Sequence, residues 1–254
     1  MLDILIHSGY VITMQGKGTG VIVNGAVGIE GNRIVCVGDS EDLMKQYQAH
    51  RYIDAKNKVV MPGLIDAHCH ASDAVFRGVA QDIDLWLERG IGPFQEHWTL
   101  GHRRAGAALH VLEGVKNGTT TFNDSEFELD SSVAATFDQF GVRARLSTLV
   151  NELPRDQYEV DLNELYTFDP AHGEEGLRDA KELINAYGTD KNNRISCMVA
   201  PQGMDMVSEE LMMELKELAL TNGTMIHIHL SQAPFEVFQT VKRYGLRPVA
   251  LLEK

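Results

Sequence analysis

Cysteine is scarce in this chain of 254 residues. Its three cysteines, Cys36, Cys69 and Cys197, are odd in number and widely separated, and each lies in an apolar run. Chains that depend on disulfides are rich in cysteine and belong to oxidising compartments. The sequence therefore argues against a disulfide framework and predicts a reducing compartment, with the cytoplasm as the location.

Basic residues are also in short supply, with 23 Lys and Arg against 36 Asp and Glu, a net charge of -13 and a pI near 5.2. That balance repels phosphate backbones and anionic lipids, and no run of Lys and Arg reverses it locally. No uninterrupted apolar run approaches the ~20 residues that span a bilayer, and the first residues lack the basic and apolar parts of a signal peptide. Neither nucleic acid nor a membrane is expected as a partner.

Turn residues divide the first part of the chain into short apolar segments. β-Strands are expected over 4–14, 21–29 and 34–37. A hairpin loop is expected at Gly31 and Asn32. The composition is 44% hydrophobic, which is enough to bury the core of one large domain, either alone or together with a small second domain. We expect residues 1–60 to form a small β-domain.

From residue 61 onward, apolar strands alternate with longer helical patterns. Strands are expected near 61–68, 118–124, 142–150, 194–201 and 223–230, and helices over 101–117 and 208–222. Because these strands are apolar on both faces, a parallel sheet covered by helices is predicted. A closed barrel is favoured over a doubly wound sheet, so the expected fold class is α/β, a partial (β/α)8 TIM barrel. Only five strand-helix units are found, and the missing three would need on the order of 100 further residues.

Two of the predicted strands carry a His-x-His pair. Residues 61–70 read MPGLIDAHCH, and residues 226–230 read IHIHL. Successive side chains of a strand point to opposite faces, so His68 and His70 lie on one face and Cys69 on the other. Histidine is uncommon in buried apolar strands unless it has a partner, and paired imidazoles can hold one metal ion. The pattern favours metal-assisted hydrolysis, and the alternative is core histidines bonded to backbone carbonyls.

Other polar residues fall at the ends of the predicted strands. A TIM barrel gathers its active site at the carboxyl ends of its strands, where His70, Asp124, Gln202 and His229 would lie. Asp124 would contact substrate, support a metal ligand, or end its strand through local bonds. Trp86 would cover the mouth of the barrel or pack in the core. We expect the strand-end residues to converge on one rim.

These motifs, together with FRG at 76–78, WL at 86–87, GTTT at 118–121 and HIHLS at 227–231, resemble the amidohydrolase superfamily. Within it the chain looks like the cytosolic aminohydrolase branch, which includes methylthioadenosine/S-adenosylhomocysteine deaminases, guanine deaminases and s-triazine hydrolases. The resemblance extends from the N-terminal strands to the last residue. It implies a metal-dependent barrel over 61–254, preceded by the N-terminal part of a β-sandwich domain over 1–60, each lacking its C-terminal share.

The resemblance implies that His68, His70 and His229 are metal ligands. One divalent ion is implied, zinc or alternatively iron(II), because residues 199–202 read VAPQ where binuclear members carry a bridging lysine. A sixth-strand histidine and an eighth-strand aspartate of the family have no counterpart and would lie beyond residue 254. No catalytic residue is therefore assigned in this chain. His227 is expected to line the interior or to orient the site.

Two positions depart from the family pattern. Gln232 stands where deaminases of this branch usually carry a glutamate that relays a proton to the substrate ring, a step worth ~10²- to 10⁴-fold in rate. Gln202 stands where many members have a histidine that contacts substrate near the metal. An amide forms hydrogen bonds but does not titrate. We expect substrate to be bound by Trp86, Gln202 and Asp124.

The expected function is metal-dependent hydrolysis of a carbon-nitrogen bond, the deamination of a small amino-substituted heterocycle by metal-activated water. Because of Gln232, displacement of a halide or another leaving group on a heteroaromatic ring is a second interpretation. A third is a catalytically inactive fragment or a metal-binding module. Its open sheet edges would favour a homo-oligomer or pairing with a complementing chain.

Overall fold

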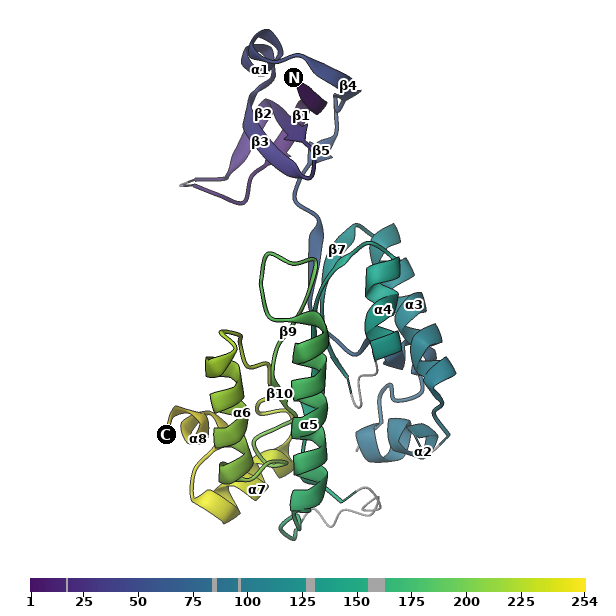
Figure 1. Cartoon of the computed structure of the whole chain (residues 1–254), viewed down its shortest axis with the longest axis vertical. Helices are drawn as coiled ribbons and strands as arrows, with labels where there is room; N and C mark the ends of the chain where they lie inside the picture. The colour runs from purple at the N-terminus through teal and green to yellow at the C-terminus, as the bar shows by residue number, and fades with distance from the viewer. Residues whose placement is uncertain (17, 84–85, 96, 127–130, 155–162) are drawn as a thin grey trace. The chain divides into compact units, whose positions relative to one another are not determined.

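The computed structural model describes residues 1–16, 18–83, 86–95, 97–126, 131–154 and 163–254. The chain divides into two compact units, Met1–Gly63 (unit 1) and Leu64–Lys254 (unit 2), each with its own sheet (Figure 1). Within those described ranges, no helix combines the length and apolar character that crossing a membrane requires.

Unit 1 contains one five-stranded sheet in the order β3-β2-β1-β4, with β5 also paired to β1. Its elements are β1 Leu2–Ile12, β2 Val21–Glu30, β3 Arg33–Asp39, α1 Ser40–Gln46, β4 Ala49–Asp54 and β5 Val59–Val60. The β1-β2 and β2-β3 pairs are antiparallel, whereas β4 and β5 run parallel to β1. The small core of the unit is formed by Leu2, Leu5, Ala26 and Leu43.

The three strands expected in unit 1 are confirmed as β1, β2 and β3. The hairpin turn between β2 and β3 is also confirmed, with Gly31 at a φ of +57° that glycine adopts without strain. Helix α1 was not expected, because seven residues are too few to show a helical period. Its start is fixed by the Asp39 side chain, which accepts from the Glu41 and Asp42 amides. The described residues of unit 1 supply one sheet, so the β-sandwich stays a prediction.

Unit 2 is a parallel sheet covered by helices. Its strands are β6 Leu64–Cys69, β7 Thr119–Glu126, β8 Arg143–Val150, β9 Ile195–Cys197 and β10 Ala200–Pro201. They pair in the order β6-β7-β8-β10, with β9 also on β8, and every pair is parallel. The strands adjoin in the order in which they occur along the chain, as in a barrel, whereas a doubly wound sheet reverses its order. The α/β class and the partial barrel are confirmed.

Helices separate the strands of unit 2 along the chain. They are the 3₁₀-helix η1 Ala71–Phe76, the π-helix η2 Trp86–Ile91, α2 Gly92–Gln95, α3 Leu100–Lys116, α4 Ser131–Gln139, α5 Pro170–Tyr187, α6 Glu209–Thr221, α7 Pro234–Tyr244 and α8 Pro248–Glu253. The helices expected over 101–117 and 208–222 are confirmed as α3 and α6. Thr99 and Ser208 cap these two helices, since their side chains accept from the amides of His102 and Leu211.

The last two expected strands are less regular than the sequence suggests. The strand expected over 194–201 is divided into β9 and β10. The strand expected over 223–230 pairs through two isolated parallel bridges, Val199 to Ile226 and Gly203 to His229. The bridges are four residues apart on one segment and three on the other, so the register shifts and the ladder breaks. His229 nevertheless remains aligned beside the end of β10.

Close packing of α3 against η1 depends on a glycine. A Cβ added to Gly106 would lie 2.0 Å from the carbonyl oxygen of Ser72. That oxygen is a backbone atom and cannot rotate away as a side chain could. Gly106 therefore sets how closely α3 approaches the turn that follows β6.

Gly106→Ala is expected to lower the free energy of unfolding by about 1–3 kcal/mol, because overpacking must displace backbone. The expected loss outweighs the gain of about 1 kcal/mol that alanine brings to a helix. Urea denaturation followed by circular dichroism measures it. Gly101→Ala is the matched control on α3, since the nearest atom to its new Cβ is 3.5 Å away. Equal stability of the two variants would contradict the prediction.

Candidate metal centre

Histidines from two distant segments meet at the carboxyl end of the unit 2 sheet. His68 lies on β6 and His70 directly follows it, while His229 is aligned by its bridge to Gly203. One ring nitrogen each of His68, His70 and His229 lies within 4.8 Å of the others. We call these three residues the histidine cluster. The expected convergence of the two His-x-His segments is thus present in the structure.

The backbone determines which ring nitrogen of His70 and His229 is free. His70 Nδ1 donates to the Ser125 carbonyl, and His229 Nδ1 donates to the Gln202 carbonyl at 2.8 Å. A carbonyl oxygen only accepts, so each Nδ1 carries a hydrogen and Nε2 of the neutral ring is bare. The two Nε2 atoms lie 3.2 Å apart. Two lone pairs at that distance repel unless a cation lies between them, so the arrangement fits a divalent metal.

Desolvation favours the neutral form of three rings in this region, those of His68, His70 and His227. Desolvation lowers the pKa of His70 to about 4, and the nearby His229 adds to the effect. Desolvation also lowers the pKa of His68 and of His227. Near neutral pH these rings therefore keep the lone pairs that a metal needs.

His227 contacts the histidine cluster through His68. His227 Nε2 lies 2.8 Å from His68 Nδ1, and the His227 amide donates to the Val199 carbonyl at 2.8 Å. Of the two roles expected for His227, this contact favours orienting the site. In the part of the chain that the structure describes, His227 Nδ1 is buried without a hydrogen-bond partner.

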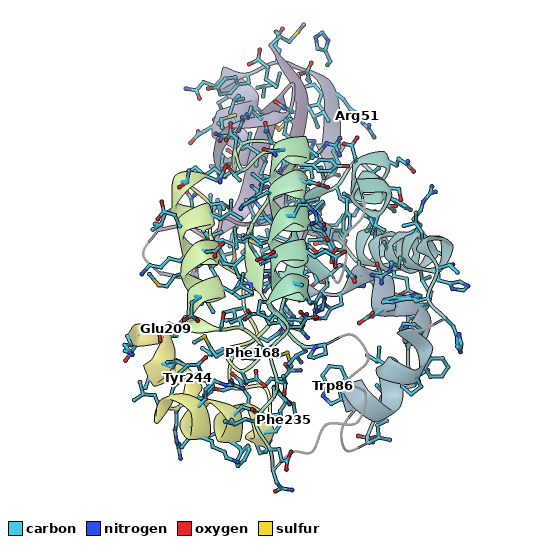
Figure 2. All side chains as sticks on the ribbon, turned by 60° about the horizontal axis from the view of Figure 1, so that its bottom comes forward. Arg51, Trp86, Phe168, Glu209, Phe235 and Tyr244 are labelled. Atoms are coloured by element: carbon cyan, nitrogen blue, oxygen red, sulfur yellow. The ribbon has the colours of Figure 1, made fainter. Side chains whose placement is uncertain are left out.

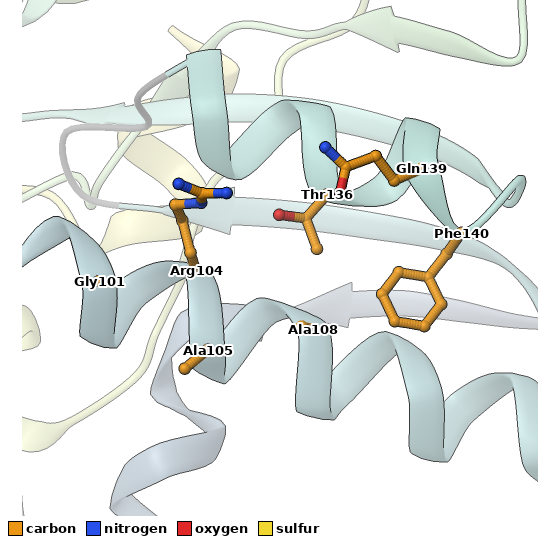
Figure 3. A pocket seen from close by; sticks show the side chains of 7 residues that line it. All are labelled: Gly101, Arg104, Ala105, Ala108, Thr136, Gln139 and Phe140. Atoms are coloured by element: carbon orange, nitrogen blue, oxygen red, sulfur yellow. The ribbon is translucent and has the colours of Figure 1, made fainter.

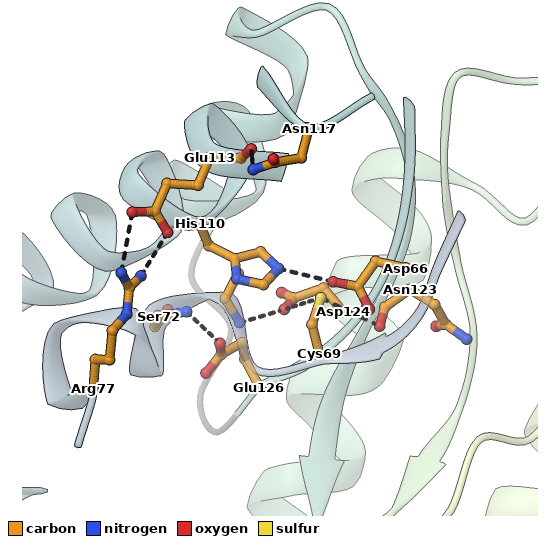
Figure 4. Close-up of polar contacts among 11 residues, drawn as sticks. Asp66, Cys69, Ser72, Arg77, His110, Glu113, Asn117, Asn123, Asp124 and Glu126 are labelled. Carbon is orange, nitrogen blue, oxygen red and sulfur yellow. Dashed lines mark hydrogen bonds and ion pairs between the residues drawn. The ribbon is translucent and has the colours of Figure 1, made fainter. Parts of the chain in front are cut away.

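Two buried carboxylates of β7 hold the turn that follows His70 (Figure 4). Ala71 N donates to Asp124 Oδ1 at 2.8 Å, and Ser72 N donates to Glu126 Oε1 at 2.6 Å. The side chains are 0% and 2% exposed, and desolvation raises the pKa of both carboxyls. Because Asp124 has no exposed surface, its position favours support of a metal ligand over contact with substrate.

A third buried carboxylate holds the turn that follows His229. Glu236 on α7 accepts from the amides of Ser231 at 2.9 Å and Gln232 at 2.5 Å. Ser231 has a φ of +58°, which is uncommon for a residue other than glycine. The bonds to Glu236 offset the cost of this turn and fix the backbone from which the exposed Gln232 side chain projects.

Gln202 and Trp86 lie in different surroundings. Gln202 is buried and serves the site through its main-chain carbonyl, which the sequence did not reveal. Trp86 lies in η2 with its side chain 40% exposed (Figure 2), and its neighbours 84–85 lie outside the described residues. Substrate binding by these two residues stays a prediction.

Residues 59–254 match the amidohydrolase family. This chain belongs to the amidohydrolase family. The match extends over most of the chain and includes both His-x-His segments.

The relatives of this amidohydrolase chain include curated deaminases. It is 34% identical over 255 residues to 5'-deoxyadenosine deaminase of Methanosarcina acetivorans, covering 100% of this chain and 54% of that protein. It is 34% identical over 254 residues to 5-methylthioadenosine/S-adenosylhomocysteine deaminase of Thermodesulfovibrio yellowstonii, covering 98% of this chain and 54% of that protein. The chain thus spans about half the length of these relatives.

Solved structures share the fold of this amidohydrolase chain. An adenosine deaminase from Xanthomonas campestris with bound zinc has a TM-score of 0.83 and 25% identity, covering 99% of this chain and 54% of its own. Atrazine chlorohydrolase from Arthrobacter aurescens TC1, complexed with zinc, has a TM-score of 0.83 and 20% identity, covering 98% and 57%. The second likeness concerns the fold alone.

Apart from Asp124, the groups that support the histidine cluster were not found from the sequence. The carbonyls of Ser125 and Gln202 are main-chain groups, so their residue types carry no signal. Glu126 lies in a stretch that gives no periodic pattern. Glu236 had one usable signal, since it follows Pro234 by two residues in the first turn of α7, where an acid often accepts from backbone amides.

A hollow between α3 and α4 does not include the histidine cluster (Figure 3). It is lined by Gly101, Arg104, Ala105, Ala108, Thr136, Gln139 and Phe140. Arg104 is the only charged group in this lining, and none of the lining side chains is a carboxylate, histidine or cysteine. The hollow therefore offers no set of metal ligands.

Glu126→Ala is expected to weaken metal binding by the histidine cluster about 10- to 100-fold, because the turn after His70 loses the acceptor of the Ser72 amide. Glu126→Gln keeps an accepting oxygen and should bind nearly as the unmodified chain does. Competition with a chromophoric chelator measures both affinities. Glu113→Ala, which removes the exposed partner of Arg77, is the control. Unchanged affinity in Glu126→Ala would contradict the role of this carboxylate.

Proposed function

We propose that this chain forms the metal-binding part of a metal-dependent amidohydrolase that deaminates an amino-substituted heterocycle. The observation that carries the proposal is the histidine cluster, in which the bare Nε2 atoms of His70 and His229 lie 3.2 Å apart. Three protein ligands with a remaining open position are typical of catalytic zinc sites. Zinc is the proposed ion, and iron(II) is the alternative.

The metal and the residues of the chain would have different roles in the reaction. A divalent metal supplies Lewis acidity and a water-derived nucleophile near neutral pH. His68, His70 and His229 would hold it, with the rings of His70 and His229 oriented by the Ser125 and Gln202 carbonyls. The curated deaminases among the relatives support a small heterocyclic substrate.

The residue Gln232 supports a second candidate function, the displacement of a leaving group on a heteroaromatic ring. Its exposed amide stands three residues after His229, where the resemblance led us to expect a glutamate that relays a proton. A leaving group that needs no protonation, such as a halide on a heteroaromatic ring, would depend less on that acid. Hydrolytic displacement of such a group is therefore the alternative reaction.

The proposal includes a cellular location and a kind of binding partner. The three cysteines are free thiols, which supports a cytoplasmic location. A homo-oligomer or a complementing chain stays the expected partner, because the segment 226–229 pairs with the sheet only through two bridges.

His68→Ala combined with His70→Ala is expected to remove the zinc held by the histidine cluster, because it deletes two of the three proposed ligands. Elemental analysis of the purified chain after equilibration with zinc measures the metal content. His50→Ala combined with His97→Ala is the matched control, since both of these histidines are exposed and lie outside the histidine cluster. Equal zinc content in the two double variants would refute the ligand assignment.

The reaction is tested on the zinc-loaded protein with amino-substituted and chloro-substituted heterocycles. We expect no ammonia release from this chain alone, because the sixth-strand histidine and the eighth-strand aspartate of the family have no counterpart in it. In a chain completed by those strands, ammonia release should require zinc and rise by on the order of 10²-fold in Gln232→Glu, since a carboxyl relays protons. Chloride release without ammonia would favour the alternative reaction. In the completed chain, zinc bound with release of neither product would contradict an enzymatic function and support a metal-binding module. Zinc-dependent ammonia release from this chain alone would overturn the first expectation.

A further inference from the structure

A second set of metal-ligating side chains lies between β6, β7 and α3 (Figure 4). Asp66 and Cys69 come from β6, and His110 comes from α3. One ligand atom of each of these three residues lies within 4.8 Å of the others. None of them belongs to the histidine cluster. Carboxylate, thiolate and imidazole together form a ligand set that suits zinc.

Hydrogen bonds already link these side chains and Asp124 in pairs. His110 Nε2 bonds to Asp66 Oδ2 at 3.1 Å, and the Cys69 thiol donates to Asp124 Oδ1 at 3.6 Å. Zinc bonds of about 2.0–2.2 Å to nitrogen and oxygen and about 2.3 Å to sulfur put neighbouring ligand atoms about 3.4–3.6 Å apart. A side-chain adjustment of about 1 Å at the widest pair would bring the set to those values.

Asp124 points an unpartnered oxygen into the same region. Its side chain is fully buried, and its Oδ1 accepts from the Ala71 amide at 2.8 Å. Its Oδ2 has no hydrogen-bond partner among the residues that the structure describes. Figure 4 shows this carboxylate beside Cys69, facing the space that Asp66 and His110 enter. A buried carboxylate oxygen without a partner is costly, and a cation would remove that cost.

The charge around this set also favours a cation. Asp73 and Glu126 lie near Asp124 and raise the number of buried or half-buried carboxylates in the region. Arg103 offsets part of their charge, since it acts on both Asp73 and Glu126. A divalent ion would balance the charge of those carboxylates that are ionised.

We propose that Asp66, Cys69 and His110 bind a zinc ion, with Asp124 in the fourth position. Coordination releases the Cys69 thiol proton to solvent and leaves the thiolate on the metal. Because all four ligands come from the protein, the site has no open position and its role is structural. It joins α3 to β6 and β7, the strands that carry the histidine cluster and its supporting turn.

Cobalt(II) is the probe that separates this site from the histidine cluster, because only a sulfur ligand gives thiolate-to-cobalt charge-transfer absorption. The chain is freed of metal with a chelator and titrated with cobalt(II). We expect a thiolate band that saturates once this site and the histidine cluster are both filled, at no more than two cobalt ions for each chain, and that zinc abolishes. Absence of the band would overturn the proposal.

Variants of the chain test whether the thiolate-to-cobalt band comes from the proposed ligands. Cys69→Ser and His110→Ala should each abolish it, and His110→Ala changes only a partly exposed position of α3, so it serves even if Cys69→Ser does not fold. Cys36→Ser and Cys197→Ala are controls that should keep the band. His68→Ala combined with His70→Ala should keep it as well, which makes this test independent of the proposed function. Loss of the band in a control, or in the double histidine variant, would overturn the proposal.

Discussion

The direction of two N–H bonds decides what the histidine cluster can bind. Because the Ser125 and Gln202 carbonyls take the Nδ1 hydrogens of His70 and His229, the two Nε2 lone pairs face one another. Each carbonyl belongs to the segment that lies beside its histidine in the sheet. The parallel pairing of the strands therefore brings the histidines together and also orients the rings of His70 and His229.

Buried carboxylates stabilise the two turns that follow His70 and His229. Asp124 and Glu126 accept from the two amides that follow His70, and Glu236 accepts from two amides that follow His229 by two and three residues. Burying a carboxylate is costly, but charge-assisted bonds to backbone amides are strong and offset that cost. Both turns are thus fixed by buried acids, which come from the neighbouring strand β7 after His70 and from α7 after His229.

The sequence predicts the histidine cluster better than it predicts its support. The period-two strand and the His-x-His spacing place His68, His70 and His229 together, and the helical patterns over 101–117 and 208–222 predict α3 and α6. The break between β9 and β10 and the two bridges of 226–229 depend on register, which no local pattern encodes. The supporting carbonyls carry no side-chain signal, and the burial of Glu126 and Glu236 arises only when distant elements pack.

Very few residues separate the boundary between the two units from the first histidine of the histidine cluster. Unit 1 ends at Gly63 and β6 begins at Leu64, only a few residues before His68. The Leu64 amide donates to the Gly118 carbonyl at 2.9 Å, which fastens the first residue of β6 to the chain just before β7. The strand that carries His68 therefore also receives the chain directly from unit 1, and its first residue is already anchored within unit 2.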